Sequence, residues 1–300
     1  MMNDIKIMIE LSNENYQLTT LKPLSLAIPV IFQTKENTAT QPNHFSAHFA
    51  ASEPMSAGTF VGDTEQGGSC NVNELTINPH CNGTHTETVA HICDFKHEHS
   101  KKITDISLPP FIPCVLVSIK PKHRCDTSES YTPALSANDE LITRIALEDL
   151  IGRYSNEQLQ CLALRTLPNN EDKCRQIYAQ NNQPPFFSRE AILYLNERGV
   201  EHLILDIPSL DRLHDDGLLT CHHLFWQVDE GNHQASEKSL VNKTITEMAF
   251  IDNEISDGFY FINLQVPAFA NDAAPSNPTL YGCKPLLQHN KEKEKSYDLQ

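Results

Sequence analysis

The segment from residue 78 to residue 91 holds the densest group of side chains in the chain that can bind a metal ion or transfer a proton. Its four main candidates are Cys81, His85, Glu87 and His91. A thiolate, an imidazole and a carboxylate form a ligand set for zinc or a similar divalent ion, and three protein ligands leave one position open for water. An open position is typical of a catalytic site, in which His91 is free to accept a proton beside the metal.

The sequence around these residues predicts how they come together. The dipeptide Asn82-Gly83 favours a chain reversal, because both residue types tolerate positive φ. If the chain leaves this turn as a strand, His85 and Glu87 point to the same face, since side chains alternate along a strand. Cys81 then approaches from the other side of the turn. His80 is the alternative ligand if the turn is shifted by one residue.

Chance also produces clusters of this kind in a chain with 14 histidines and 9 cysteines. A lone Cys or His is more often a packed or surface residue than a ligand. No CxxC or HExxH pattern is present to favour a metal. Spacing alone therefore leaves a metal site and an accidental cluster as equal alternatives.

The run Gly83-Thr84-His85-Thr86-Glu87, followed by His91, resembles the signature of the bacterial cyclase family of metal-dependent hydrolases, which includes the kynurenine formamidases and isatin hydrolases. That signature is His-x-Gly-Thr-His-x-Asp-x-Pro-x-His. Its first two histidines and its aspartate bind metal, and its last histidine is a catalytic base. The resemblance implies these roles, in that order, for Cys81, His85, Glu87 and His91.

Three positions depart from the signature. Cys81 keeps a ligand but makes it softer and anionic, which favours zinc over manganese. Glu87 keeps the carboxylate on a side chain longer by one methylene group, and Val89 replaces the proline. The resemblance thus implies a site for one or two zinc ions, with manganese as the alternative.

Two later segments resemble the parts of the family that bind a second metal. Alignment of the apolar residues after His222-His223 makes His222 the better ligand candidate, and the segment Thr246-Glu247 implies Glu247 as the final carboxylate ligand. A carboxylate in an apolar stretch is notable in itself, since carboxylates are rarely buried unless they are paired or bind metal. The alternative for Glu247 is a strand residue that faces solvent.

Further segments imply residues that surround the pocket without binding metal. Arg165-Thr166 resembles the pair that ends a strand near the pocket in the family, and Asp206-Ile-Pro-Ser209-Leu-Asp211 resembles the family segment Asp-x-Pro-Ser-x-Asp. Turn chemistry alone also explains the second segment. The surrounding residues are then Arg165, Thr166, Asp206, Ser209 and Asp211, together with His80 and His223.

The pattern of elements predicts an α/β fold. Continuous apolar runs at 113–119, 160–166 and 200–206 are typical of strands buried on both faces. A helix is expected from Ser188 to Arg198, with Gly199 ending it, and another over 141–152, with Ser136 and Asp139 as a capping box. Residues 33–74 are expected to form a long loop across the mouth of the site. The order of strands and helices predicts a single domain with a mixed, partly parallel sheet and flanking helices, and the resemblance implies the swivelling β/β/α type.

We divide the chain into an N-terminal extension (1–20), a cyclase-like domain (21–288) and a disordered charged tail (289–300). The net charge of −16 and the lack of a Lys/Arg cluster argue against nucleic acid or a membrane as a partner. No apolar run approaches the ~20 residues that cross a bilayer. Charges near the N-terminus and unpaired cysteine spacing favour a cytoplasmic location with free thiols.

These observations predict a hydrolase that cleaves the C–N bond of a small amide. The resemblance implies an N-formyl arylamine or a cyclic amide as the substrate, and a homodimer as the assembly. One alternative is a member of the same fold that binds metal or a small molecule without catalysis. Another is a structural zinc site, which would need four protein ligands and no open position.

Overall fold

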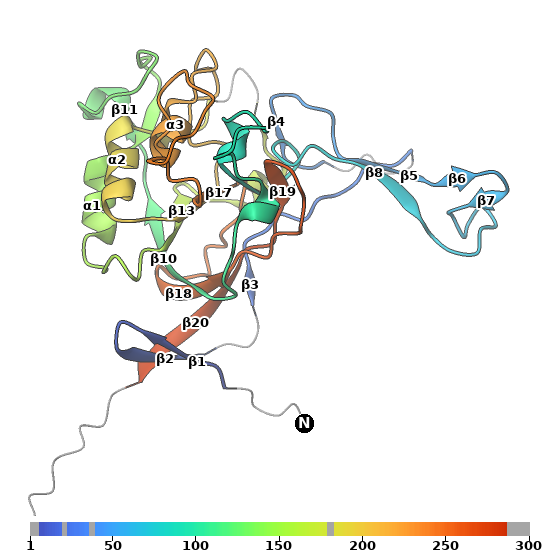
Figure 1. Cartoon of the computed structure of the whole chain (residues 1–300), viewed down its shortest axis with the longest axis horizontal. Coiled ribbons are helices and arrows are strands. Elements are labelled where there is room, and N and C mark those ends of the chain that lie inside the picture. The colour runs from blue at the N-terminus through green and yellow to red at the C-terminus, as the bar shows by residue number, and fades with distance from the viewer. Residues whose placement is uncertain (1–5, 20–22, 36–39, 179–182, 287–300) are drawn as a thin grey trace, which may run out of the picture.

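A computed structural model describes residues 6–19, 23–35, 40–178 and 183–286. Its main feature is an 11-stranded sheet whose centre is parallel (Figure 1). The parallel strands, in spatial order, are β10 (Ile112–Ile119), β13 (Cys161–Thr166), β16 (His202–Leu205) and β17 (Thr244–Glu247). These strands arise from the apolar runs of the sequence, and nearly all their residues are buried, as strands covered on both faces must be.

Antiparallel strands extend both sides of this parallel centre. Beyond β17 lie β9 (His85–Glu87) and β19 (Ala273–Pro275), and beyond β10 lie β18 (Gly258–Asn263), β20 (Thr279–Leu286), β2 (Glu14–Leu18) and β1 (Met8–Leu11), with β3 (Leu24–Ser25) also paired to β20. The predicted mixed, partly parallel sheet is confirmed. The β1–β2 hairpin lies within residues 1–20, which the sequence predicts to be an N-terminal extension. Strand β2 pairs with β20, so this hairpin is part of the main sheet. The assigned tail, 289–300, is outside the described residues.

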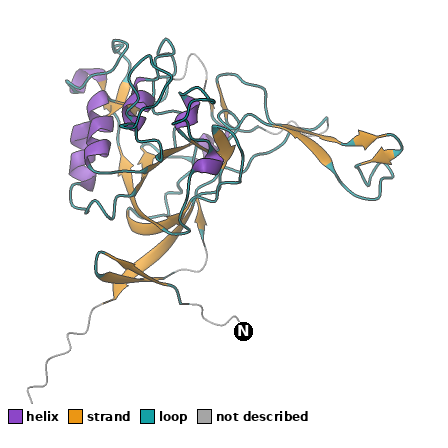
Figure 2. Ribbon diagram, in the orientation of Figure 1, coloured by secondary structure: helices purple, strands orange, loops and turns teal. Residues whose placement is uncertain are grey.

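Three α-helices gather on one side of the sheet (Figure 2). They are α1 (Arg144–Ile151), α2 (Arg189–Glu197) and α3 (Thr220–Trp226). Helix α2 begins as predicted, because the Ser188 hydroxyl accepts a hydrogen bond from the Ala191 amide. Gly199 follows it with φ of 70°, a conformation that favours glycine.

The start of α1 differs from the prediction. Thr143, rather than Ser136 or Asp139, caps the helix by accepting a hydrogen bond from the Ala146 amide. Ser136 and Asp139 bond to each other in an earlier turn, where the Ser136 amide donates to Asp139 Oδ2. The helix starts later because β12 (Glu140–Ile142) takes the first residues of the expected span into a strand.

Short elements connect these layers. The strand pairs are β4 (Asn43–His44) with β14 (Ile177–Tyr178), and β12 with both β11 (Lys122–His123) and β15 (Phe186–Phe187). The 3-10 helices are η1 (Val89–His91), η2 (Ile103–Asp105), η3 (Arg124–Asp126) and η4 (Glu171–Arg175).

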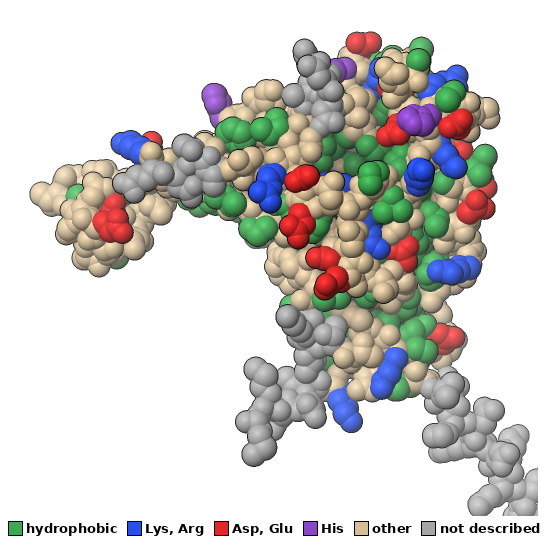
Figure 3. Space-filling model, turned by 180° about the vertical axis from the view of Figure 1, so that it is seen from behind, with side chains coloured by type: hydrophobic (Ala, Val, Ile, Leu, Met, Phe, Trp, Pro, Cys, Tyr) green, Lys and Arg blue, Asp and Glu red, His purple; other side chains and the backbone are tan. Residues whose placement is uncertain are grey.

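Part of the expected long loop is instead an arm that stands out from the body of the molecule. Strand β5 (Ala51–Pro54) pairs with β8 (Asn73–Thr76), and β6 (Ser56–Ala57) pairs with β7 (Phe60–Val61). Views from opposite sides both show the arm projecting away from the sheet (Figures 1 and 3). Polar composition favoured a loop, but backbone pairing between segments about 20 residues apart forms the arm.

The main hydrophobic core lies between the sheet and the helices, and it gives a direct test of this packing. Leu195 of α2 is fully buried there, whereas Leu193 on the same helix is 44% exposed. We expect Leu195→Ala to lower the free energy of unfolding by about 2–5 kcal/mol, because it leaves a cavity. Leu193→Ala should change it by less than about 0.5 kcal/mol. Urea unfolding measures both, and equal effects would contradict this placement of α2.

No helix among the described residues has the length and apolar character needed to cross a membrane.

Candidate metal centre

Strand β9 carries two of the predicted residues, His85 and Glu87, into the centre of the site. It lies between β17 and β19, so that His85 pairs with Glu247, and Glu87 pairs with Ala273. Both side chains are fully buried. The preceding turn requires a glycine, because Gly83 has φ of 152° and an added Cβ would lie 3.3 Å from a Val30 methyl group.

Other elements bring further histidines to β9. His91 ends η1 and His222 lies in α3, 135 residues from Glu87 in sequence. His222 Nε2 lies 3.0 Å from Glu87 Oε1 and 3.8 Å from Glu247 Oε1. His85 Nε2 lies 3.4 Å from Glu247 Oε2, and His91 Nδ1 lies 3.9 Å from Glu87 Oε2. The structure thus brings together five residues predicted from the sequence.

Two further residues, His80 and Asp272, complete the cluster. His80 Nδ1 lies 3.1 Å from Glu87 Oε2, and His80 Nε2 lies 2.8 Å from Asp272 Oδ2. Asp272 Oδ2 is also 3.5 Å from His91 Nδ1. The sequence predicts His80 as the alternative to Cys81 as a ligand, and it predicts no metal-binding role for Asp272. The sequence signal at Asp272 is the resemblance of the segment Asp272-Ala-Ala-Pro275 to a short family segment that precedes the last strand.

Three overlapping groups of these residues can each surround one cation, since their ligand atoms lie within 4.8 Å of one another. The groups are His80, His85 and Glu87; Glu87, His91 and His222; and His80, His91 and Asp272. Glu87 and His80 each belong to two groups. A carboxylate shared between neighbouring groups is suited to a site for one or two ions.

The charges of the cluster shift the pKa values of its members in opposite directions. Burial acts to raise the pKa of Glu87, but His91 and His222 hold it well below its usual range. Burial acts to lower the pKa of His222, but Glu87 and Asp211 hold it well above its usual range. For His80 the pKa rises to about 10, because Asp272 and Glu87 outweigh burial. In the absence of a cation, the positive charge favoured on His80 and His222 therefore opposes the negative charge of the carboxylates.

Two buried atoms support a cation as the natural partner of this cluster. His85 Nε2 and Glu87 Oε2 are inaccessible to solvent and form no hydrogen bond. His80 Nδ1 is close to Glu87 Oε2, but the contact is an ion pair by distance alone. Unpaired buried polar atoms are costly. Imidazole nitrogens and carboxylate oxygens are common ligands of zinc and manganese, so the donor set fits such an ion.

Cys81 is buried but belongs to none of the three groups. Burial, assisted by the charge of Glu247, raises the pKa of its thiol to about 11. The structure therefore surrounds Cys81 with an environment that favours the thiol over the thiolate that binds metal.

Asp211 orients His222 from behind. Its Oδ2 lies 2.6 Å from His222 Nδ1, and its Oδ1 accepts hydrogen bonds from the Tyr131 hydroxyl and the Cys221 amide at 2.7 Å. Ser209 Oγ accepts from the Asp211 amide at 3.1 Å. A carboxylate bound to the outer nitrogen of a histidine fixes the ring and leaves the inner nitrogen free to bind metal.

The remaining predicted residues lie outside the cluster. Asp206 accepts hydrogen bonds from Thr166 and pairs with Lys173 Nζ at 2.6 Å, and Arg165 binds Ser118, Asp257 and two backbone carbonyls. These contacts join the ends of β13 and β16 to neighbouring loops. His223 is buried, and its Nδ1 lies 3.2 Å from the Val228 carbonyl.

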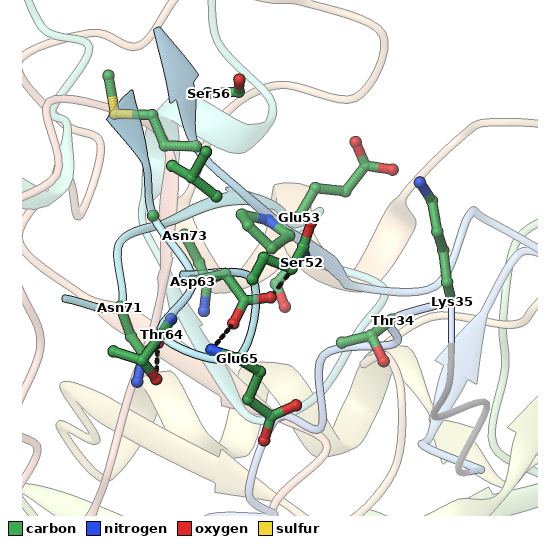
Figure 4. A pocket seen from close by; sticks show the side chains of 15 residues that line it. Thr34, Lys35, Ser52, Glu53, Ser56, Asp63, Thr64, Glu65, Asn71 and Asn73 are labelled. Carbon is green, nitrogen blue, oxygen red and sulfur yellow. Dashed lines mark hydrogen bonds between the residues drawn. The ribbon is translucent and has the colours of Figure 1, made fainter. Parts of the chain in front are cut away.

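A polar groove of about 520 Å³ lies on the arm, away from these histidines. Figure 4 shows Asp63, Thr64, Glu65 and Asn71 close together there, with the amides of Glu65 and Thr64 donating to Asp63 and Asn71. The groove shares no lining residue with the cluster. The hydrogen bonds of the groove lie within the loop of the arm and account for its polar side chains. The groups that can bind a metal ion lie in the histidine cluster, which is therefore the candidate site.

Comparison with known proteins gives the family. The Cyclase family model matches residues 11–212, which is more than half of the chain. The chain belongs to the cyclase family. This match includes β9 and η1 of the cluster but ends just after Asp211. No curated protein matches the chain.

Solved structures share the cyclase fold at low sequence identity. A potential metal-dependent hydrolase with cyclase activity is 14% identical, with a TM-score of 0.53 over 87% of this chain and 98% of the other. A novel cyclase is 13% identical, with a TM-score of 0.56 over 88% of each chain. Isatin hydrolase A from Labrenzia aggregata is 15% identical, with a TM-score of 0.50 over 92% and 93%. These likenesses establish the α/β fold of this cyclase-family member.

Proposed function

We propose that this cyclase-family protein is a metal-dependent hydrolase that cleaves the C–N bond of a small amide with water. The observation that carries the proposal is the buried Glu87 carboxylate, whose Oε2 forms no hydrogen bond and which lies among the rings of His80, His91 and His222. A fold alone would not imply an activity, but this site provides the groups that the reaction needs.

The inner residues of the cluster would hold the ion. These inner side chains are no more than 5% exposed, so they are placed to bind the ion and not to contact substrate. They belong to His85, Glu87, His222 and Glu247. A bound zinc or manganese ion supplies Lewis acidity, which polarises an amide carbonyl and lowers the pKa of water. Asp211, through its contact with His222 Nδ1, keeps the other ring nitrogen of His222 directed at Glu87.

His91 is suited to transfer the proton. Its side chain is 26% exposed, more than those of the inner residues, and it lies at the accessible side of the cluster. Asp272 Oδ2, 3.5 Å from Nδ1, is close enough to steady the ring when it carries a proton. His91 would take the proton of the attacking water and return it to the leaving nitrogen.

Isatin hydrolase among the similar folds supports a cyclic amide as substrate, and the signature around His85 supports an N-formyl arylamine equally. Both substrate classes can be tested by assaying zinc-loaded and manganese-loaded protein against formamides, lactams and cyclic imides. Hydrolysis of at least one class, abolished by a chelator, is expected. If loaded protein binds these compounds but hydrolyses none, the fold serves as a binding protein.

Removing the charge of Asp211, which contacts His222, should lower the metal affinity of the site while its other residues stay in place. We expect Asp211→Asn to lower metal affinity by about 10–100-fold, because the His222 ring loses the partner that orients it. Calorimetric titration with zinc measures this change. Asp206→Asn, which breaks an equally buried network away from the cluster, is the matched control and should leave metal affinity unchanged. Equal losses in both variants would mean that Asp211 acts only through stability.

A further inference from the structure

The sequence signature and the structure give different positions for one ligand. By alignment with the signature, Cys81 stands where the family has its first metal-binding histidine. In the structure, the ring that lies beside His85 and Glu87 is that of His80, one residue earlier. Its centroid lies 5.1 Å from that of His85 and 4.4 Å from that of His91.

The turn before β9 directs His80 inward. The His80 amide donates to Asn78 Oδ1 at 3.1 Å, and the amides of Cys81 and Asn82 both donate to the Asn78 carbonyl. Asn82 is fully buried, and its Oδ1 accepts a second hydrogen bond between these residues, from the Asn78 amide at 2.8 Å. These bonds fix the backbone on both sides of His80.

Asp272 fixes the ring itself. Its backbone carbonyl accepts from the amide and hydroxyl of Thr88, next to Glu87, so the carboxylate is held against the edge of β9. From there Oδ2 lies 2.8 Å from His80 Nε2. A carboxylate accepts the proton on Nε2, so that Nδ1, which lies 3.1 Å from Glu87 Oε2, is the nitrogen that can bind a cation in place of a proton.

We propose that His80 replaces Cys81 as the third ligand of the metal site, and that Asp272 is the positioning residue that makes this replacement possible. This inference rests on the metal site of the proposed function. It deepens that function, because a neutral imidazole in place of an anionic thiolate makes the net charge of the ion and its ligands one unit more positive. A set of nitrogen and oxygen donors also suits manganese better than a set that includes a thiolate.

Cobalt(II) distinguishes the two ligands, because a thiolate bound to cobalt gives an intense charge-transfer band in the near ultraviolet and imidazole does not. We expect the cobalt-loaded wild-type protein to lack this band. Cys81→Ser should bind cobalt with the wild-type spectrum and affinity. His80→Ala should weaken binding by more than about 10-fold, with circular dichroism verifying that the variant is folded.

The role of Asp272 is tested by graded replacement. Asp272→Asn keeps a hydrogen-bond acceptor and should weaken cobalt binding less than Asp272→Ala does, whereas a merely structural role would give the same affinity in both. A charge-transfer band in the wild type that disappears in Cys81→Ser would overturn the assignment of His80 while supporting a metal site. Failure of wild-type protein to bind cobalt, zinc or manganese would instead overturn the proposed function and this inference together.

Discussion

Replacing His91 with alanine is expected to lower kcat for amide hydrolysis by about 10²–10⁴-fold, the contribution of a positioned proton-transfer group. The variant should keep its bound metal, because the inner residues His85, Glu87 and His222 remain in place. Steady-state kinetics on the substrate found in the screen, together with metal analysis of the same sample, measures both quantities.

His99→Ala is the matched control, since His99 is another partly exposed histidine and belongs to none of the three groups that can surround a cation. It should retain full activity. If His91→Ala instead loses metal along with activity, His91 is a ligand of the second group, with Glu87 and His222. If the variant keeps both metal and activity, another group transfers the proton.

Glu87→Gln is expected to have the larger effect, with metal affinity lowered by more than about 100-fold and hydrolysis reduced to background. The replacement preserves shape but removes the charge that faces His222 Nε2 at 3.0 Å and His80 Nδ1 at 3.1 Å. Without that charge, the rings of the cluster lose the anion around which they are arranged. Calorimetric titration with zinc and with manganese gives the affinities.

Glu87→Asp separates charge from length, because it restores the residue of the family signature. We expect this variant to retain metal binding, which the glutamine variant should lose. The same affinity in wild type and Glu87→Gln would place the metal elsewhere, and unchanged unfolding curves in all three proteins would exclude a folding defect as the cause.

The parts of the fold predicted from the sequence are those that local patterns determine. Strands β10, β13 and β16 arise from apolar runs that suit only a buried position, and α2 is bounded by Ser188 and Gly199, whose roles are local. The sequence does not predict the arm, because its strands are short and mostly polar and form only by pairing with each other. Such pairing depends on partners that a local pattern does not contain.

The candidate site shows the same division. His85 and Glu87 share a face because a strand alternates, which their spacing predicts. The choice between Cys81 and His80 depends on side-chain directions within a turn, and spacing does not determine these. Asp272 reaches His80 across 192 residues of sequence through the pairing of β19 with β9, which no local signal reveals.

Elemental analysis of the purified wild-type chain, after loading with zinc or manganese and dialysis, measures whether the residues around Glu87 bind a divalent ion. We expect about one or two divalent ions per chain in the wild type and almost none in Glu87→Gln. A wild-type chain that retains neither metal, although it is folded and concentrated, would show that the histidines and carboxylates around Glu87 do not form a metal centre.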